Sequence, residues 1–282
     1  MLWVGMKRNV LVTGCSSGLG RATALLLRER GWRVQATARA DEDLAELTRL
    51  GLEAVGLDLC SSASIAAAVD TVLQRTGGKL EGLVNNAGYS QLGAVEDLTR
   101  DELRAQFETN VFGTMELTGR VLPVLRAQRA GTVVFISSVC ARVTVPYLGS
   151  YSASKAALEA LVDALRCEMR GTGVGVHLVE PGIFNTGCYA ATSKHFHETS
   201  RSRNSLHAER CTRVLRQFAD ELATLPEERS VLVARAVAEF LEGKRRAARR
   251  VVPGPARVYE LARRFLPDGL LDAALARRRG GA

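Results

Sequence analysis

Tyr151 and Lys155 stand four residues apart in the stretch GSYSASKAAL. On a helix this spacing places both side chains on one face, about 5–6 Å apart at Cβ. A free tyrosine has a pKa of about 10, so bringing it to about 7 requires about 4 kcal/mol of preference for the phenolate. A unit charge at about 4 Å supplies that energy at an effective dielectric constant near 20. The pair predicts a general acid/base tuned by a lysine ammonium; a chance pair on a helix surface is the alternative.

A glycine-rich turn follows the first apolar run, in the stretch TGCSSGLGRA. Gly14 permits a tight turn, Gly18 allows a pyrophosphate to approach the backbone, and Gly20 allows the following helix to pack closely. The N–H groups at the start of that helix favour a phosphate. The G-x-x-x-G-x-G spacing therefore predicts a dinucleotide site on the first strand–helix turn.

The end of the second apolar run, RVQATAR, indicates which dinucleotide binds. A carboxylate after this strand would accept the adenosine ribose 2′-OH of NAD, but Ala38 and then Arg39 stand there. A guanidinium suits a 2′-phosphate, and the Ser16 and Ser17 hydroxyls add donors. The sequence thus predicts NADP(H) in preference to NAD(H). The alternative is a solvated loop whose acids neutralise Arg39: Asp41, Glu42 and Asp43.

Short buried strands alternate with helices along the chain. Strands are predicted at 9–13, 33–38, 52–59, 82–88, 132–138 and 175–180, and helices at 20–30, 62–76, 99–128 and 151–170. This alternation predicts an α/β fold, a doubly wound parallel sheet of Rossmann type. We expect one domain over 1–255, with a polar variable region at 187–225, a helix at 226–243, a last strand near 249–254 and a basic helical tail at 256–282.

The net charge of +8 is concentrated at one end of the chain. Residues 244–282 hold 11 basic and 3 acidic side chains, whereas residues 1–243 hold 27 of each. A neutral body argues against a nucleic-acid-binding domain. Six scattered cysteines form no C-x-x-C pair, and neither a signal peptide nor a membrane span is evident, so we expect a cytoplasmic protein.

Further motifs occur in a fixed order around the tyrosine. Ser138 lies thirteen residues before Tyr151, NNAG spans 85–88, Asn110 lies in TNVFG, and EPGIFNT spans 180–186. Together they resemble the short-chain dehydrogenase/reductase family in its compact single-domain form. The resemblance covers about residues 7 to 185. The stretches TGCSSGLG and VQATAR and the long tail are most similar to those of the hydroxysteroid and retinol dehydrogenase branches.

The resemblance implies a role for each matching residue. Tyr151 would be the general acid/base, Ser138 would hydrogen-bond the substrate oxygen, and Lys155 would hold the nicotinamide ribose. Asn110 would fix a water that links Lys155 to solvent, through a break in its helix near Gly113. Hydride passes directly between cofactor and substrate, so no metal is required. The implied cofactor contacts are Gly14, Ser16, Ser17, Gly18, Leu19, Gly20, Arg39, Asp58, Leu59, Asn86, Ala87, Gly88, Tyr151, Lys155, Pro181, Gly182, Ile183 and Thr186.

The residues around these motifs are mostly apolar or aromatic, which predicts a bulky lipophilic ketone or aldehyde as substrate. The predicted pocket residues are Tyr89, Leu92, Cys140, Val143, Tyr147, Phe184 and Tyr189. Ser137 is expected to face away from the site, because alternate strand residues point oppositely. A same-fold epimerase or dehydratase and a non-catalytic nucleotide-binding regulator remain as alternatives.

The other polar groups and the tail are expected to have structural roles. His195, His197 and His207 fit a polar loop better than a zinc site, because further ligands at suitable spacing are missing. The helical tail could cover the substrate pocket as a lid, pack on a partner subunit or lie on an anionic membrane, of which packing within the protein is favoured. The resemblance implies a homodimer or homotetramer through the helices at 99–128 and 152–170.

Overall fold

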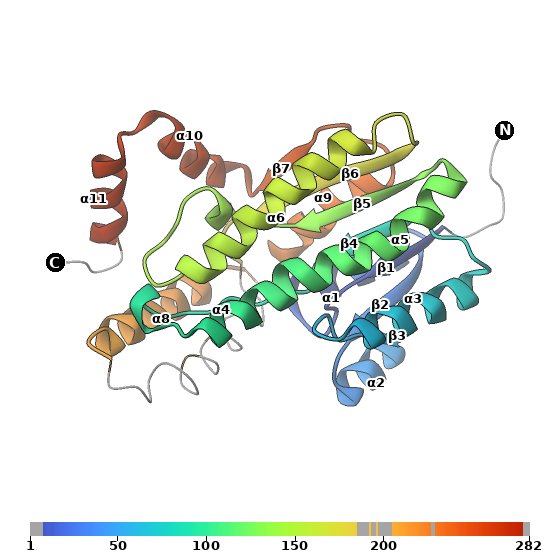
Figure 1. Ribbon diagram of the computed structural model, residues 1–282, viewed down its shortest axis with the longest axis horizontal. Coiled ribbons are helices and arrows are strands. Elements are labelled where there is room, and N and C mark those ends of the chain that lie inside the picture. Colours follow the sequence, from blue (N-terminus) through green and yellow to red (C-terminus); the bar gives the residue numbers. More distant parts are fainter. Residues whose placement is uncertain (1–7, 185–191, 193–195, 197–204, 227–228, 279–282) are drawn as a thin grey trace.

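Seven strands form one sheet in the computed structural model, which describes residues 8–184, 192, 196, 205–226 and 229–278. The strand order is β3-β2-β1-β4-β5-β6-β7, and every neighbouring pair is parallel (Figure 1). This confirms the predicted doubly wound, Rossmann-like sheet. The strands are β1 (Asn9–Val12), β2 (Arg33–Ala38), β3 (Glu53–Gly56), β4 (Gly82–Asn85), β5 (Gly131–Ile136), β6 (Val174–Pro181) and β7 (Arg249–Val252).

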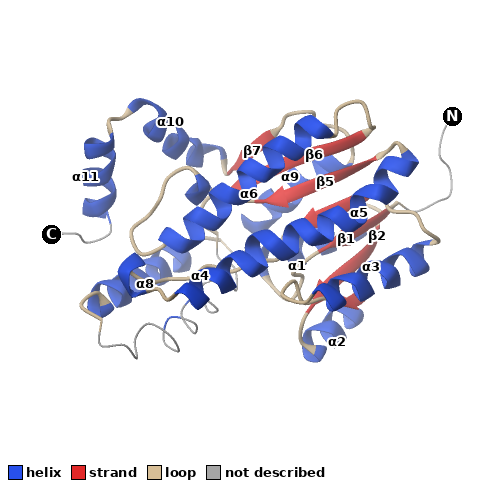
Figure 2. Ribbon diagram, viewed as in Figure 1, coloured by secondary structure: helices blue, strands red, loops and turns tan. Residues whose placement is uncertain are grey.

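Helices cover both faces of the sheet (Figure 2). One face packs against α1 (Gly18–Glu29), α2 (Asp41–Arg49) and α9 (Ser230–Leu241). The other packs against α3 (Ser62–Thr76), α5 (Thr114–Gln128) and α6 (Gly149–Glu168). Because both faces are covered, the central strands β1 and β4 are buried along their whole length. That explains why these strands are mainly apolar and do not alternate between apolar and polar residues.

Glycines end the helices where the sequence predicts. Gly31, Gly77 and Gly171 have φ angles of 82°, 62° and 77°, in the left-handed region that a side chain disfavours. At the other end of α3 the Ser61 hydroxyl accepts a hydrogen bond from the Ser64 N–H. These local signals set the helix lengths, and the helix lengths bring each following strand back to the sheet.

Three segments differ from the sequence-based expectation. The helix predicted at 99–128 consists of α4 (Arg100–Phe107), a π-helical segment (Glu108–Gly113) and α5. The acidic stretch after Arg39 forms α2 instead of a loop, because its carboxylates stand in the first turn, where the helix N–H groups favour them. The variable region contains α8 (Ala208–Ala223).

The tail forms two helices that lie beyond β7, at the same end of the molecule as α8 (Figure 1). These are α10 (Arg257–Phe265) and α11 (Asp268–Arg278), separated at Pro267. The predicted boundary near residue 255 falls between β7 and α10. Among the described residues no helix is both long and apolar enough to cross a membrane.

Candidate active site

A cavity of about 440 Å³ opens at the carboxyl ends of the central strands. Residues that follow β1, β2, β4, β5 and β6 contribute to its wall, respectively Gly14, Arg39, Asn86, Ser138 and Gly182. In a parallel sheet these ends converge where the strand order reverses, here between β1 and β4. The sheet therefore brings together residues that are far apart in the sequence.

The glycine turn after β1 packs tightly against the turn after β4. Gly14 and Gly18 have φ angles of 68° and 54°, which few residues other than glycine adopt. A Cβ on Gly20 would lie 2.1 Å from the Gly14 carbonyl oxygen and 2.4 Å from Asn86 Nδ2. The Asn86 amide donates to the carbonyls of Thr13 and Gly14, at 2.8 and 3.0 Å. The glycines thus let the backbone line the cavity with no side chain in the way.

Ser138, Tyr151 and Lys155 come from two elements that meet at the cavity wall. Ser138 follows β5 and precedes a short 3₁₀ helix (Val139–Ala141), where its hydroxyl accepts from the Cys140 N–H at 3.1 Å. Tyr151 and Lys155 lie in the first two turns of α6, with the Lys155 ammonium 5.9 Å from the centre of the tyrosine ring. That ammonium is buried and donates to the Ile136 carbonyl at 2.8 Å.

Asn110 lies in the π-helical segment directly behind this wall. Its side chain accepts from the Tyr89 N–H at 3.1 Å and donates to the Tyr89 carbonyl and to the Ser154 hydroxyl, both at 3.0 Å. A Cβ on Gly88 would lie 3.0 Å from Asn110 Oδ1 and 3.7 Å from the Lys155 ammonium. The segment therefore holds Asn110 beside Lys155, and its wide turn is the helix break that the sequence predicts near Gly113.

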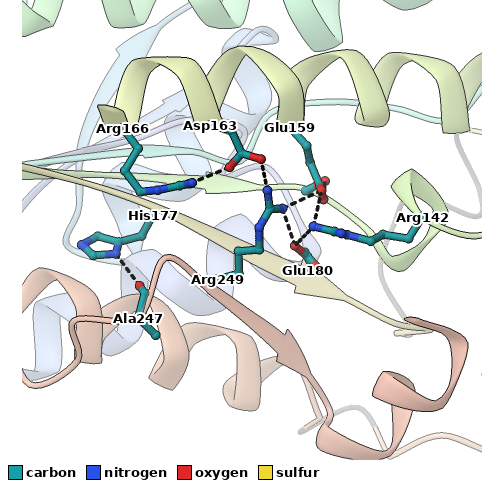
Figure 3. Close-up of polar contacts among 9 residues, drawn as sticks. Arg142, Glu159, Asp163, Arg166, His177, Glu180, Ala247 and Arg249 are labelled. Atoms are coloured by element: carbon teal, nitrogen blue, oxygen red, sulfur yellow. Dashed lines mark hydrogen bonds and ion pairs between the residues drawn. The ribbon is translucent and has the colours of Figure 1, made fainter. Parts of the chain in front are cut away.

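Ser137, the residue before Ser138, is hydrogen-bonded to an ionic network, whose charged side chains Figure 3 labels. The Ser137 hydroxyl donates to Glu159 at 2.7 Å, and Ser137 also contributes to the cavity wall, whereas strand alternation predicts that it faces away. Glu159 is buried beside Glu180, and two arginines bridge the pair. Arg142 Nη2 lies 3.1 Å from Glu159 and 3.5 Å from Glu180, and Arg249 Nη1 lies 2.7 and 3.0 Å from the same two carboxylates.

The network joins the segments that carry the candidate catalytic residues. Arg249 Nη2 also contacts Asp163 on α6, and Asp163 pairs with Arg166. Burial raises the pKa of Glu159, and the nearby charge of Glu180 raises it further, against the opposing effect of both arginines. Sequence reasoning missed this network, because directly paired members are up to 90 residues apart and only the sheet topology brings them together.

The predicted cofactor contacts lie along one continuous stretch of the cavity wall. Thr186 lies outside the described residues, and the others line the cavity: Gly14, Ser16, Ser17, Gly18, Leu19, Gly20, Arg39, Asp58, Leu59, Asn86, Ala87, Gly88, Tyr151, Lys155, Pro181, Gly182 and Ile183. Arg39 is exposed, and the structure contains no ion pair between it and the acids of α2 among the described residues. It is thus placed to meet an anion at the end of β2.

The predicted substrate pocket is only partly reproduced. Tyr89, Cys140, Val143 and Phe184 line the cavity, and Tyr189 lies outside the described residues. Leu92 and Tyr147 do not line it. They pack in a small separate core with Leu148, Phe196, Cys211, Val214 and Leu215. The reason is that α8 covers this region, and α8 had no assigned place in the sequence-based prediction.

Helix α8, which the sequence left unassigned, and helix α11, in the predicted helical tail, complete the apolar part of the cavity. Leu215, Phe218 and Leu222 line it from α8, and Leu275 lines it from α11. Their spacing on α8 is three and four residues, which is the signal that could have identified this face. Burial raises the pKa of the neighbouring Tyr89 to about 12, so that phenol stays protonated near neutral pH.

No metal site is found in the part of the chain that the structure describes. His195 and His197 lie outside that part, and the ring of His207 packs 5.9 Å from that of Tyr147. Cys140 belongs to the cavity wall. Ser138, Tyr151 and Lys155 line the cavity together with the glycine turn, and they are the candidate catalytic groups of the site.

Known proteins with similar sequence or structure point to one family. The family model for short chain dehydrogenases matches residues 8–196. Uncharacterized oxidoreductase YbbO of Escherichia coli is 41% identical over 181 residues, which cover 64% of this chain and 67% of that protein. A 3-ketodihydrosphingosine reductase of Bacteroides thetaiotaomicron is 38% identical over 178 residues, covering 63% and 64%.

A solved structure extends the similarity to nearly the whole fold. Actinorhodin polyketide ketoreductase, in a variant crystallised with NADPH, superposes with a TM-score of 0.72 at 31% identity, covering 89% of this chain and 97% of that one. The family model alone spans well over half of the sequence. The parallel sheet, the glycine turn after its first strand and these matches agree, and the chain belongs to the short-chain dehydrogenase/reductase family.

Proposed function

We propose that the protein interconverts a carbonyl and an alcohol by direct hydride transfer with NADP(H). The observation that carries this proposal is that Ser138, Tyr151 and Lys155 share one cavity with the glycine turn. A donor to the substrate oxygen, a proton-transferring phenol and a fixed cation are what carbonyl reduction requires of a protein. All three stand beside a surface suited to a dinucleotide.

The residues present fit a nicotinamide dinucleotide. The glycine turn leaves the backbone bare at the start of α1, where helix N–H groups favour a pyrophosphate. Gly88 leaves room between Asn110 and the Lys155 ammonium, where a side chain would intrude. A cofactor bound there would supply or accept the hydride. Gly14, Gly18 and Gly20 would hold its phosphates, and Lys155 its nicotinamide ribose.

The protein's own residues would handle the oxygen and the proton. Ser138, buried at the end of β5, would hydrogen-bond the carbonyl oxygen and stabilise the negative charge that develops on it. Tyr151 would give its phenolic proton to that oxygen in reduction and take it back in oxidation. Lys155 would favour the phenolate, because its ammonium is held rigidly by the Ile136 carbonyl at 2.8 Å. Asn110 would orient the water that returns the proton.

Arg39 supports NADP(H) over NAD(H). It follows β2 directly, lines the cavity and has no ion pair with the described acids of α2. A 2′-phosphate at this edge would meet a guanidinium in place of the carboxylate that selects NAD. Ser16 and Ser17 line the same part of the wall and offer hydroxyl donors.

The lining of the cavity supports a bulky lipophilic substrate. Beyond Ser138 the wall is mainly aliphatic and aromatic, formed by Val139, Val143, Val145, Leu148, Phe184, Leu215, Phe218, Leu222 and Leu275. Such a wall binds extended apolar groups and offers few partners to a polyol. Two of the similar proteins are named for ketones of this kind, 3-ketodihydrosphingosine and a polyketide.

Exposed apolar side chains support assembly through the helices at 99–128 and 152–170. Leu103, Phe112 and Leu161 are exposed on these helices. In a symmetric assembly these apolar side chains would be buried against a second copy of the chain and shielded from water. We therefore include a homodimer or homotetramer in the proposal, which light scattering of the purified chain tests.

The test of the activity is reduction of a panel of ketones, followed by NADPH absorbance. The wild type should turn over long-chain or polycyclic ketones, and Tyr151→Phe should lose at least about 10²-fold in kcat, because it keeps the ring but lacks the transferable proton. Tyr147→Phe is the matched control, because Tyr147 packs outside the cavity wall. Retained activity in Tyr151→Phe, or activity on small polyols alone, would contradict the proposal.

A further inference from the structure

Helix α10 has an apolar stripe that faces solvent. Val258, Leu261 and Phe265 stand at helical spacing, and their exposed fractions are 59%, 54% and 71%. Such a stripe normally faces the core of a globular protein. The two halves of the tail differ here, because on α11 Leu271 is buried and Leu275 lines the cavity. The apolar face of α10 is thus presented outward by a helix pair whose second member is anchored to the body.

The stripe continues past the end of α10 and is flanked by cations. Leu266 and Leu270, which follow it, are also exposed. Arg257 and Arg264 lie on α10 beside the stripe, and both are exposed to solvent. Arg263 pairs with Asp268. Two exposed guanidinium groups therefore border an exposed apolar surface.

The charge of the chain points to the occupant of this surface. Residues 244–282 carry a net charge of +8, and the rest of the protein is neutral. An exposed apolar stripe with arginines at its sides is the pattern of a helix that lies in the interface of a bilayer. Each arginine near an anionic surface contributes about 1 kcal/mol to binding. A second copy of this chain would carry the same positive charge and would repel it.

We propose that α10 docks the protein on the surface of an anionic lipid bilayer. Val258, Leu261 and Phe265 lie at the boundary between headgroups and acyl chains, and Arg257 and Arg264 contact lipid phosphates. The docking helix leads through Pro267 into α11, whose Leu275 belongs to the cavity wall. Docking thus brings the membrane close to the apolar end of the cavity, where a lipophilic substrate would enter. This last consequence rests on the proposed function, whereas the docking itself does not.

Sedimentation of the full chain with lipid vesicles tests the docking. No cofactor or substrate is added, so the result is independent of the proposed activity. Binding is expected to equimolar phosphatidylglycerol and phosphatidylcholine, and little binding to phosphatidylcholine alone. Leu261→Ser with Phe265→Ser should lower the partition coefficient by at least about tenfold, because two exposed apolar side chains lose their contact with the acyl region.

A second variant and a control separate charge from apolar contact. Arg257→Gln with Arg264→Gln should weaken binding to the anionic vesicles by about tenfold or more and leave the weak binding to neutral vesicles unchanged. Val95→Ser with Leu206→Ser is the control, because it removes two apolar side chains from another part of the surface, whose exposed fractions are 68% and 95%, against 54% and 71% for the pair changed on α10. It should bind as the wild type does, and circular dichroism checks that every variant is folded.

Three results would overturn the proposal. The first is no sedimentation of the wild type with anionic vesicles. The second is an equal loss of vesicle binding in the control variant, which would show that binding does not depend on α10 in particular. The third is a fall in the molar mass of the free protein on changing Leu261 and Phe265, as measured by light scattering. That outcome would identify the stripe as a subunit interface.

Discussion

Replacing Arg249 by methionine removes the central cation of the network behind Ser138. Its guanidinium lies 2.7 Å from Glu159 and 3.0 Å from Glu180 and also contacts Asp163 (Figure 3). The side chains of Glu159 and Glu180 are 8% and 0% exposed. The variant therefore leaves two buried carboxylates beside a single cation, Arg142. Methionine has a similar apolar stem, so packing changes little.

The expected loss of stability is about 3 kcal/mol near neutral pH. Breaking a buried ion pair costs about 3–5 kcal/mol, because the remaining charge is desolvated and uncompensated. The low end applies here for two reasons. Arg142 stays 3.1 Å from Glu159 and 3.5 Å from Glu180, and the Arg249 side chain is itself 26% exposed.

The loss should shrink as the pH falls. Burial and the charge of Glu180 already raise the pKa of Glu159, and removing Arg249 raises it further. Between the unfolded and the raised folded pKa, the native state binds more protons than the unfolded state, so stability decreases as the pH rises through that window. As the pH falls to the raised pKa of Glu159, the native variant takes up a proton that relieves the repulsion, and more of its stability is kept.

Urea unfolding followed by circular dichroism measures these differences, with the slope m checked for constancy. Arg250→Met is the matched control on the same strand, because its partner Glu239 is 34% exposed and the pair should contribute less than about 1 kcal/mol. Adding Glu159→Gln to Arg249→Met should restore part of the loss. A loss for Arg249→Met below about 1 kcal/mol, or one that is independent of pH, would refute the reasoning.

Two further substitutions test the dinucleotide site. Arg39→Ala should erase an NADPH preference of about ten- to a hundred-fold in kcat/KM and leave the NADH kinetics nearly unchanged; equal wild-type values for both cofactors would contradict this. Gly20→Ala should abolish NADPH binding in a fluorescence titration and lower Tm, because its Cβ would lie 2.1 Å from the Gly14 carbonyl. Gly119→Ala is the control, because no described atom lies within 4 Å of the added Cβ, and it should keep the wild-type NADPH binding and Tm. Wild-type NADPH binding and Tm in Gly20→Ala would show that the turn can relax around the added methyl group.

The sequence predicts the sheet well because each of its signals is local. Apolar runs mark the strands, and Gly31, Gly77 and Gly171 mark helix ends whose left-handed φ angles the structure has. Helix α2 was harder to predict from the sequence, because three consecutive acidic residues are also typical of a solvated loop. In the structure they stand in the first turn of α2, where the helix N–H groups favour them. Helix α8 was missed for a related reason, since its apolar spacing is interrupted by arginines and its burial depends on the cavity it covers.

The candidate site was predictable where the residue types and their spacing in a short motif determine the local geometry. Tyr151 and Lys155 share a helix face by spacing alone, and Gly14 and Gly20 owe their close packing to the lack of a side chain. The substrate side has no such signal. Leu92 was placed in the pocket because it follows a motif, but it packs in a separate core that forms around α8. Leu275 reaches the cavity from α11, near the end of the chain, and no local pattern predicts that contact.

One face of α6 links the chemistry to the fold. Tyr151, Lys155 and Glu159 stand at successive intervals of four residues, so they project from the same side of the helix. Lys155 donates to the carbonyl of Ile136, and Glu159 accepts from the hydroxyl of Ser137. These two hydrogen bonds fix the register of α6 against the end of β5. Ser138 directly follows Ile136 and Ser137, so its position is fixed with them.

That register determines where the tyrosine stands relative to the serine. Because Ser138 and Tyr151 belong to different elements, their separation depends on how β5 and α6 are held together. Arg249, from β7, holds Glu159 and Asp163, which follow Lys155 at the next two intervals of four residues along the same helix. A shift of about 1 Å in such a pair of groups is enough to slow a reaction about 10²-fold. The strand farthest along the sheet thus helps to set the geometry at which a proton would move.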